Sequence, residues 1–99
     1  LDRLSGRRRI DALGVVVENL TPGLARELAV ETSGILVQRV DPRGKAARFG
    51  LQPGDVIIEL NGRRVASADE LEEAWQQSNR ELRLIVSRGG RLLMIRSTP

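Results

Sequence analysis

The stretch from Ala12 to Val17, with the sequence Ala-Leu-Gly-Val-Val-Val, combines residue types that can bind a free carboxylate through the main chain. Gly14 lacks a Cβ atom, so the backbone can bend tightly there and another group can approach it closely. A turn that opens directly into a strand can direct successive backbone N–H groups toward one point, which suits an anion. The same residues also fit an ordinary turn followed by a core strand, and they do not distinguish the two interpretations.

The three consecutive valines after Gly14 predict a strand, because branching at Cβ favours an extended backbone. A strand at the edge of a sheet has unpaired N–H and C=O groups, and these can accept an extended peptide as an additional strand. The turn and the strand together therefore indicate a site for a peptide, provided that the strand lies at an edge.

The composition excludes several kinds of catalytic and metal site. The chain contains no cysteine and no histidine, so thiolate catalysis, disulfides, imidazole zinc sites and Ser-His-Asp triads are ruled out. Lys45 is the only lysine and lies in a predicted turn, which disfavours a Ser-Lys pair. We therefore expect no enzymatic activity, no catalytic residues, no cofactor and no metal in this chain.

The net charge of +3 does not indicate nucleic-acid binding. Arginine supplies 15 of the 16 basic residues, and Arg7-Arg8-Arg9 is the single cluster. Nucleic-acid sites combine basic residues with aromatic ones, but the only aromatic residues are Phe49 and Trp75. The apolar runs are too short to insert into a membrane. We expect neither nucleic acid nor direct membrane insertion.

The length of 99 residues suits one small domain with a single core. Residues 1–11 are polar and basic, which indicates a linker or a flexible lead-in. Residues 12–99 are predicted to form the folded domain. Because the chain begins at Leu1 and not at methionine, we expect it to be part of a longer protein.

Apolar runs predict six short strands, at residues 13–20, 35–40, 56–60, 63–65, 81–87 and 92–95. Asn61-Gly62 predicts a tight hairpin, because both residues tolerate positive φ. Short helices are predicted at residues 22–28 and 45–49. We therefore expect an α+β, mainly β fold: a small antiparallel barrel or sandwich of five to six strands, capped by one long and one or two short helices.

The long helix is predicted at residues 67–78. Ser67 and Glu70 have the spacing of a capping box, and further acidic residues follow in the first half, where the helix dipole favours them. Leu71, Ala74 and Trp75 recur at helical spacing, which predicts one apolar stripe along this helix.

The order of these motifs resembles that of a known family. Leu13-Gly14-Val15-Val16 is followed by Gly34-Ile35-Leu36-Val37, by residues 44–57 with the sequence GKAARFGLQPGDVI, by Asn61-Gly62 and by the long helix. Over about residues 12–97, this arrangement resembles a PDZ domain of the circularly permuted bacterial form that occurs in HtrA/Do-type (Deg) serine proteases.

The resemblance implies that the loop at 12–15 binds a C-terminal carboxylate, that the following strand accepts the peptide as an antiparallel strand, and that the long helix forms the opposite wall. The peptide-binding residues implied in this way are Ala12, Leu13, Gly14, Val15, Val16, Val17, Ala68, Leu71, Glu72 and Trp75.

Some of these residues allow a second interpretation. The pocket formed by Leu13, Val15, Val17 and Leu71 would be apolar and would select aliphatic or aromatic C-termini. Trp75 either narrows this pocket or belongs to the core. For Glu72, a solvated charge is the favoured interpretation and a specificity contact the alternative. For Arg8 and Arg9, linker residues are the favoured interpretation, and an approach to the carboxylate is the alternative.

The resemblance implies a peptide-binding module for protein quality control in the bacterial periplasm or cell envelope. It would capture hydrophobic C-terminal or extended segments of substrate or unfolded proteins, and regulate or feed an attached serine protease. One alternative is a structural or oligomer-assembly domain that contacts its own protease domain or neighbouring subunits and uses its groove little. Another is a PDZ domain of a site-2-type membrane protease or of a secretion component.

Overall fold

The structure, a computed structural model, describes residues 7–27, 34–77 and 82–97. Its strands are β1 (Arg7–Ile10), β2 (Val15–Asn19), β3 (Ile35–Val40), β4 (Val56–Leu60), β5 (Arg63–Arg64), β6 (Leu82–Arg88) and β7 (Arg91–Ser97). Its helices are α1 (Pro22–Glu27), α2 (Lys45–Phe49) and α3 (Ala68–Gln77). None of these helices is long and apolar enough to cross a membrane.

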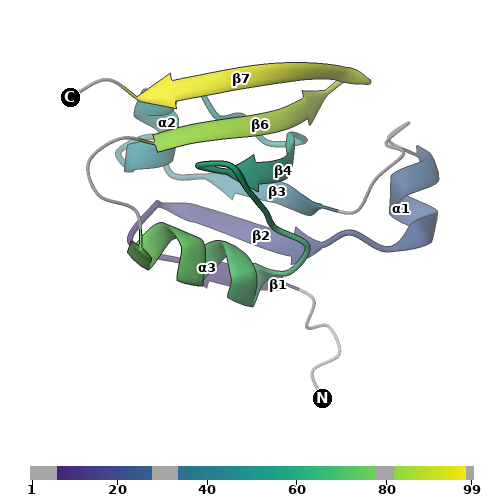
Figure 1. The fold of residues 1–99 in the computed structure, drawn as a ribbon, viewed down its shortest axis with the longest axis horizontal. Coiled ribbons are helices and arrows are strands. Elements are labelled where there is room, and N and C mark those ends of the chain that lie inside the picture. Colours follow the sequence, from purple (N-terminus) through teal and green to yellow (C-terminus); the bar gives the residue numbers. More distant parts are fainter. Residues whose placement is uncertain (1–6, 28–33, 78–81, 98–99) are drawn as a thin grey trace.

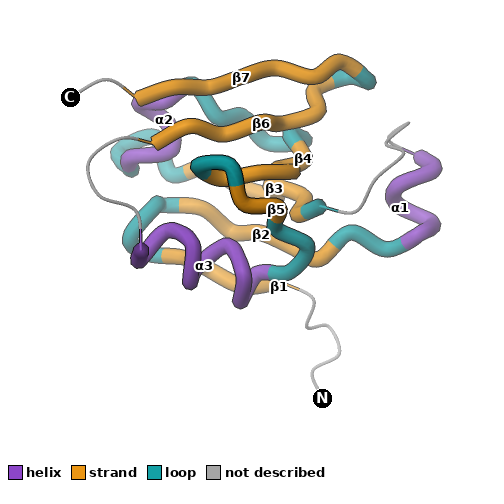
Figure 2. The backbone as a smooth tube through the Cα atoms, viewed as in Figure 1, coloured by secondary structure: helices purple, strands orange, loops and turns teal. Residues whose placement is uncertain are grey.

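All strand pairs are antiparallel, and the strands form one sheet in the order β1-β2-β3-β4-β6-β7. The short β5 lies off this path and pairs with β4 (Figure 2). Among the described residues, β1 and β7 are the two ends of an open sheet. Figure 1 shows β7 at the top, β1 at the bottom and α3 in front of β1 and β2.

The main core is aliphatic, because the chain offers only two aromatic side chains. It combines buried residues from the first strands, from α3 and from β6, among them Ile10, Val17, Leu71 and Val86. Phe49 and Trp75 are only partly buried and pack against its margin. Alternate residues of β3 and β4 face the other side of the sheet, where Leu36, Val56 and Ile58 form a smaller cluster.

A buried charge pair fastens the loop before β4 to the end of β6. The carboxylate of Asp55 is almost fully buried, with 1% of the residue exposed. Arg88 donates to both of its oxygens at 2.8 Å, and the Gln52 N–H donates to Oδ2 at 2.9 Å. The hydrogen bond with Asp55 raises the pKa of the Arg88 guanidinium. This bidentate contact with a carboxylate is the geometry that the planar guanidinium favours.

The predicted mainly β fold with capping helices is confirmed, and so is the hairpin at Asn61-Gly62, where φ is 52° and 84°. All six predicted strands are present within a few residues of their predicted bounds. The predicted helix ends at Leu28 and Ser78 lie outside the described residues. The described part of the chain has seven strands instead of five or six, because β1 was not predicted.

The assignment of residues 1–11 to a linker or flexible lead-in was wrong for residues 7–10, which form β1. The reason is that three of its four residues are arginines, and an arginine run resembles solvent-exposed linker. Its regular structure comes from pairing with β2, a contact with a distant part of the domain that the local residue types do not show.

Candidate functional site

The loop between β1 and β2 is held in a bend that requires glycine. Gly14 has a φ of 77°, and a Cβ atom there would lie 2.9 Å from Cα of Gly44. The carbonyl of Leu13 accepts from the Ala46 N–H at 3.0 Å, and that of Gly14 accepts from the Asp41 N–H at 2.8 Å. Since C=O and N–H point in opposite directions across a trans peptide, the Gly14 N–H is turned away from the segment 41–46.

Two N–H groups of this loop meet at one oxygen. The Leu13 N–H and the Gly14 N–H donate to the carbonyl oxygen of Ile10, at 3.1 and 2.8 Å. Convergent backbone donors of this kind suit an oxygen that carries negative charge. In this structure the two N–H groups close the turn between β1 and β2 on a carbonyl oxygen of the same chain.

The neighbouring strand β2 is paired on both sides. It pairs with β3 along one edge and with β1 along the other, where Ile10 lies opposite Val15 and Arg8 lies opposite Val17. The expectation that β2 presents an open edge to a peptide was therefore wrong. The strand that covers this edge is itself short, with four residues.

Ile10 is the residue that anchors β1 in the core. It is 1% exposed and belongs to the same buried cluster as Leu13, Val15, Val17 and Leu71, the four residues that were predicted to form the apolar pocket. Within the structure, β1 contributes the Ile10 side chain to this cluster.

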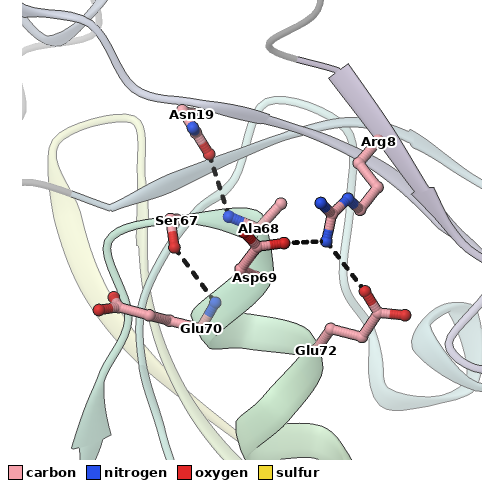
Figure 3. A network of polar contacts seen from close by, with 7 residues as sticks. All are labelled: Arg8, Asn19, Ser67, Ala68, Asp69, Glu70 and Glu72. Atoms are coloured by element: carbon pink, nitrogen blue, oxygen red, sulfur yellow. Dashed lines mark hydrogen bonds and ion pairs between the residues drawn. The ribbon is translucent and has the colours of Figure 1, made fainter.

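The start of α3 is fastened to the end of β2. The Ala68 N–H donates to Oδ1 of Asn19 at 3.0 Å, and the Glu70 N–H donates to Oγ of Ser67 at 3.1 Å (Figure 3). The Glu70 carboxylate accepts from the Ala66 N–H at 2.7 Å, so the predicted capping box closes one residue earlier than the standard motif. At the other end of the helix, Gln77 accepts from Arg63 at 2.7 Å.

Arg8 connects β1 to α3 (Figure 3). Its Nη1 atom donates to Oε1 of Glu72 at 3.0 Å and forms an ion pair with Asp69. The hydrogen bond with Asp69, assisted by Glu72, raises the pKa of the Arg8 guanidinium. All three side chains are partly exposed, so each ion pair contributes at most about 1 kcal/mol. The contact orients β1 more than it stabilises the domain.

The structure brings most of the predicted site residues together. Leu13, Val15, Val17, Ala68 and Leu71 share one buried cluster, and Trp75 packs against its margin. Ala12 is exposed, and Val16 points to the opposite face of β2. The side chain of Trp75 also lies under Lys45, whose Nζ is 5.3 Å from the ring centroid.

Two charged residues behave differently from the interpretation favoured for them. Glu72 forms an ion pair with Arg8 while its side chain stays 40% exposed, and Arg8 lies in a strand and not in a linker. Ile10, Asp69 and Asn19 were not predicted as site residues. Arg8 and Ile10 are two positions apart and lie on the same face of β1, but one pair of residues at this spacing does not by itself indicate a strand.

A cleft of about 280 Å³ lies between the loop and the end of β3. Arg9, Val16 and Arg39 line it, and they face one another across three strands. Val16 alternates with Val15 and Val17 along β2, and Arg9 and Arg39 are its partners on the neighbouring strands. The cleft therefore opens on the face of β2 that does not pack against α3.

Comparison with known proteins identifies the family. The family model for the PDZ domain matches residues 36–88. The chain belongs to the PDZ domain family. It is 36% identical over 97 residues to a probable periplasmic serine endoprotease DegP-like of Chlamydia pneumoniae, covering 95% of this chain and 20% of that protein. It is also 36% identical over 94 residues to serine protease HTRA3 of Mus musculus, covering 88% of this chain and 20% of that protein.

Solved structures agree with this assignment. The HtrA3 PDZ domain bound to a phage-derived ligand (FGRWV) superposes with a TM-score of 0.74 at 36% identity, covering 90% of this chain and 82% of that one. The HtrA-type protease AlgW with a decapeptide gives 0.69 at 36% identity, covering 85% and 27%. The resemblance to PDZ domains of HtrA/Deg proteases is confirmed, and this chain spans about a fifth of the length of the curated relatives named above.

Proposed function

We propose that this PDZ domain captures hydrophobic C-terminal tails of substrate or unfolded proteins, and that it regulates or feeds a serine protease in the same polypeptide. The incoming tail would pair with β2 in place of β1. Its terminal carboxylate would take the position of the Ile10 carbonyl, and its last side chain would enter the cluster around Val15, Val17 and Leu71.

The observation that carries this proposal is the convergence of the Leu13 and Gly14 N–H groups on one oxygen, at 3.1 and 2.8 Å. Hydrogen bonds to an ionised acceptor are roughly twice as strong as those to a neutral one. A free carboxylate would therefore bind these donors better than the neutral carbonyl of Ile10 does, which gives a chain terminus an advantage over an internal segment.

The relatives support peptides as the partner. The related HtrA3 domain was solved with the ligand FGRWV, and the related AlgW with a decapeptide. FGRWV ends in a β-branched residue and has arginine two positions earlier. In β1, Ile10 and Arg8 have the same relation. Two of the relatives are named probable periplasmic serine endoproteases, which supports a place for this protein in the periplasm or cell envelope.

A titration that compares a free acid with its amide tests the proposal. The ¹⁵N-labelled domain is titrated with a peptide that ends in an aliphatic residue, and then with the same peptide carrying a C-terminal amide. We expect chemical-shift changes at residues 12–18 and 68–76 with the acid and much weaker binding of the amide. Equal binding of both, or changes confined to other residues, would contradict carboxylate capture.

An assembly role is the second candidate, and the far edge of the sheet favours it. Leu92 and Met94 on β7 are 69% and 59% exposed, and they share one face of an edge strand. Apolar side chains on an edge can pack against a neighbouring domain or subunit. Replacing both by lysine in the full-length protein should lower its oligomeric state, measured by light scattering, while an unchanged oligomer would contradict this role.

A further inference from the structure

We propose that β1 is an internal ligand of the peptide site and that the site prefers peptides that resemble β1. The preferred peptide has a free C-terminus, an aliphatic last residue and arginine two positions earlier. Asp69 and Glu72 would be the residues that determine this preference. The inference rests on the proposed function, and it adds a side-chain preference and a built-in competitor to it.

The register shows which positions a bound peptide would occupy. β1 runs antiparallel to β2, with Ile10 opposite Val15 and Arg8 opposite Val17. A peptide that replaces β1 with the same direction places its last residue at the position of Ile10. Its third residue from the end then takes the position of Arg8, on the same face of the strand.

The last position selects an apolar side chain. Ile10 is 1% exposed within an aliphatic cluster, and its carbonyl oxygen accepts from Leu13 and Gly14. A polar side chain at this place would lose water without gaining a partner. A residue of similar volume to isoleucine would retain both the packing and the two hydrogen bonds.

The earlier position selects positive charge. Asp69 and Glu72 are three residues apart and therefore neighbours on one helix face, and both contact Arg8. The other two arginines of β1 find their partners elsewhere: Arg7 approaches Glu18 at 3.8 Å and Arg9 contacts Asp11 at 2.6 Å. An acidic side chain at the position of Arg8 would meet two like charges, which disfavours the wrong ligand as well as favouring the right one.

The tether makes β1 a competitor. Only the loop at 11–14 separates β1 from β2, so β1 is always present at high effective concentration near its site. A peptide can pair with β2 only in the fraction of molecules in which β1 has left, and its apparent affinity is reduced by that fraction. Weakening β1 should therefore strengthen peptide binding.

Three peptides that differ only at the third residue from the end measure the preference. They end in Arg-Ala-Ile, Ala-Ala-Ile and Glu-Ala-Ile, and their binding to the 99-residue chain is followed by calorimetry. We expect the arginine peptide to bind about three- to tenfold more tightly than the glutamate peptide. The double variant Asp69→Lys with Glu72→Lys should invert this order. Glu73→Lys reverses one charge on the exposed side of α3, away from Arg8, and should leave the order unchanged.

The variant Arg8→Glu tests the competition. It places a negative charge opposite Asp69 and Glu72, and β1 should detach more often. We expect the arginine peptide to bind about threefold or more tightly to this variant than to the original chain, and the amides of β1 to exchange hydrogen faster. An unchanged affinity in the variant would show that β1 is not a competitor.

The outcomes separate the inference from the proposed function. Equal binding of the three peptides, with the free acids still preferred over amides, would overturn the charge preference and leave carboxylate capture intact. Failure of every peptide to bind both the original chain and Arg8→Glu would overturn carboxylate capture, and the inference with it.

Discussion

The two ends of the sheet, β1 and β7, are attached in different ways. β7 pairs with β6 along its whole length, from Arg91 to Ser97, and places Ile95 in the core. β1 pairs over four residues, and its three arginines are exposed while Ile10 alone is buried. Because exposed ion pairs contribute little stability and β1 has the shorter pairing, we expect β1 to leave the sheet at a lower free-energy cost than β7. Each strand buries one residue, Ile10 in β1 and Ile95 in β7, but β7 pairs over seven residues instead of four and also packs Leu93 against the core.

The largest expected effect lies on the side of β6 and β7. Asp55→Ala removes the buried carboxylate that receives both prongs of Arg88 and the Gln52 N–H. Breaking a buried pair on one side is costly, and we expect the free energy of unfolding to fall by about 3 kcal/mol, at the lower end because Arg88 is partly exposed. Urea denaturation followed by circular dichroism measures it. A fall of less than about 1 kcal/mol in the free energy of unfolding would show that the Asp55–Arg88 pair contributes no more than an exposed ion pair.

Truncation of one buried side chain on each side compares the two regions directly. Leu84→Ala on β6 should lower the free energy of unfolding by about 3 kcal/mol, the usual cost of such a core cavity. Ile10→Ala should cost less, about 1 kcal/mol, because the domain can release β1 and stay folded. Denaturation curves for the two variants give both values. If Ile10→Ala costs as much as Leu84→Ala, β1 belongs to the framework.

A change in the loop tests whether the two N–H groups depend on its bend. Gly14→Ala forces a non-glycine residue to a φ of 77° and places Cβ against Gly44 at 2.9 Å. We expect a loss of about 1–3 kcal/mol in the free energy of unfolding, together with loss of the preference for free acids over amides. Gly23→Ala provides a control, because a Cβ atom at Gly23 would have no neighbouring atom within 4 Å. An unchanged preference in Gly14→Ala would separate carboxylate capture from this bend.

The smallest expected effect concerns the ion pairs of Arg8. The pKa of Arg8 is raised in the folded protein, so its stabilising contribution is present at all lower pH values and is lost only as pH rises through that pKa, far above neutrality. Raising pH from neutral to mildly alkaline should therefore not release β1, whereas added salt should, because it screens exposed charges. Hydrogen exchange of the β1 amides measures both. Release of β1 by mild alkali alone would contradict this account.

The sequence was sufficient for features that depend on neighbouring residues. The bend at Gly14, the hairpin at Asn61-Gly62 and the capped start of α3 follow from residue types at short spacing, and all three are present. Features that depend on distant partners were missed. Arg8 and Glu72 are 64 positions apart, and Asp55 and Arg88 are 33 apart. No local pattern indicates such pairs, so β1 and its occupancy of the edge of β2 could not be predicted.

The contacts at both ends of α3 have a consequence for the size of the side chain that the proposed site would accept. Asn19 holds the first turn of the helix to β2, and Gln77 holds the last turn to β5. These two contacts would resist outward movement of the helix, and the proposed peptide would then meet a fixed distance between α3 and β2. In the proposed function, this spacing would limit the volume of the terminal side chain without a dedicated residue.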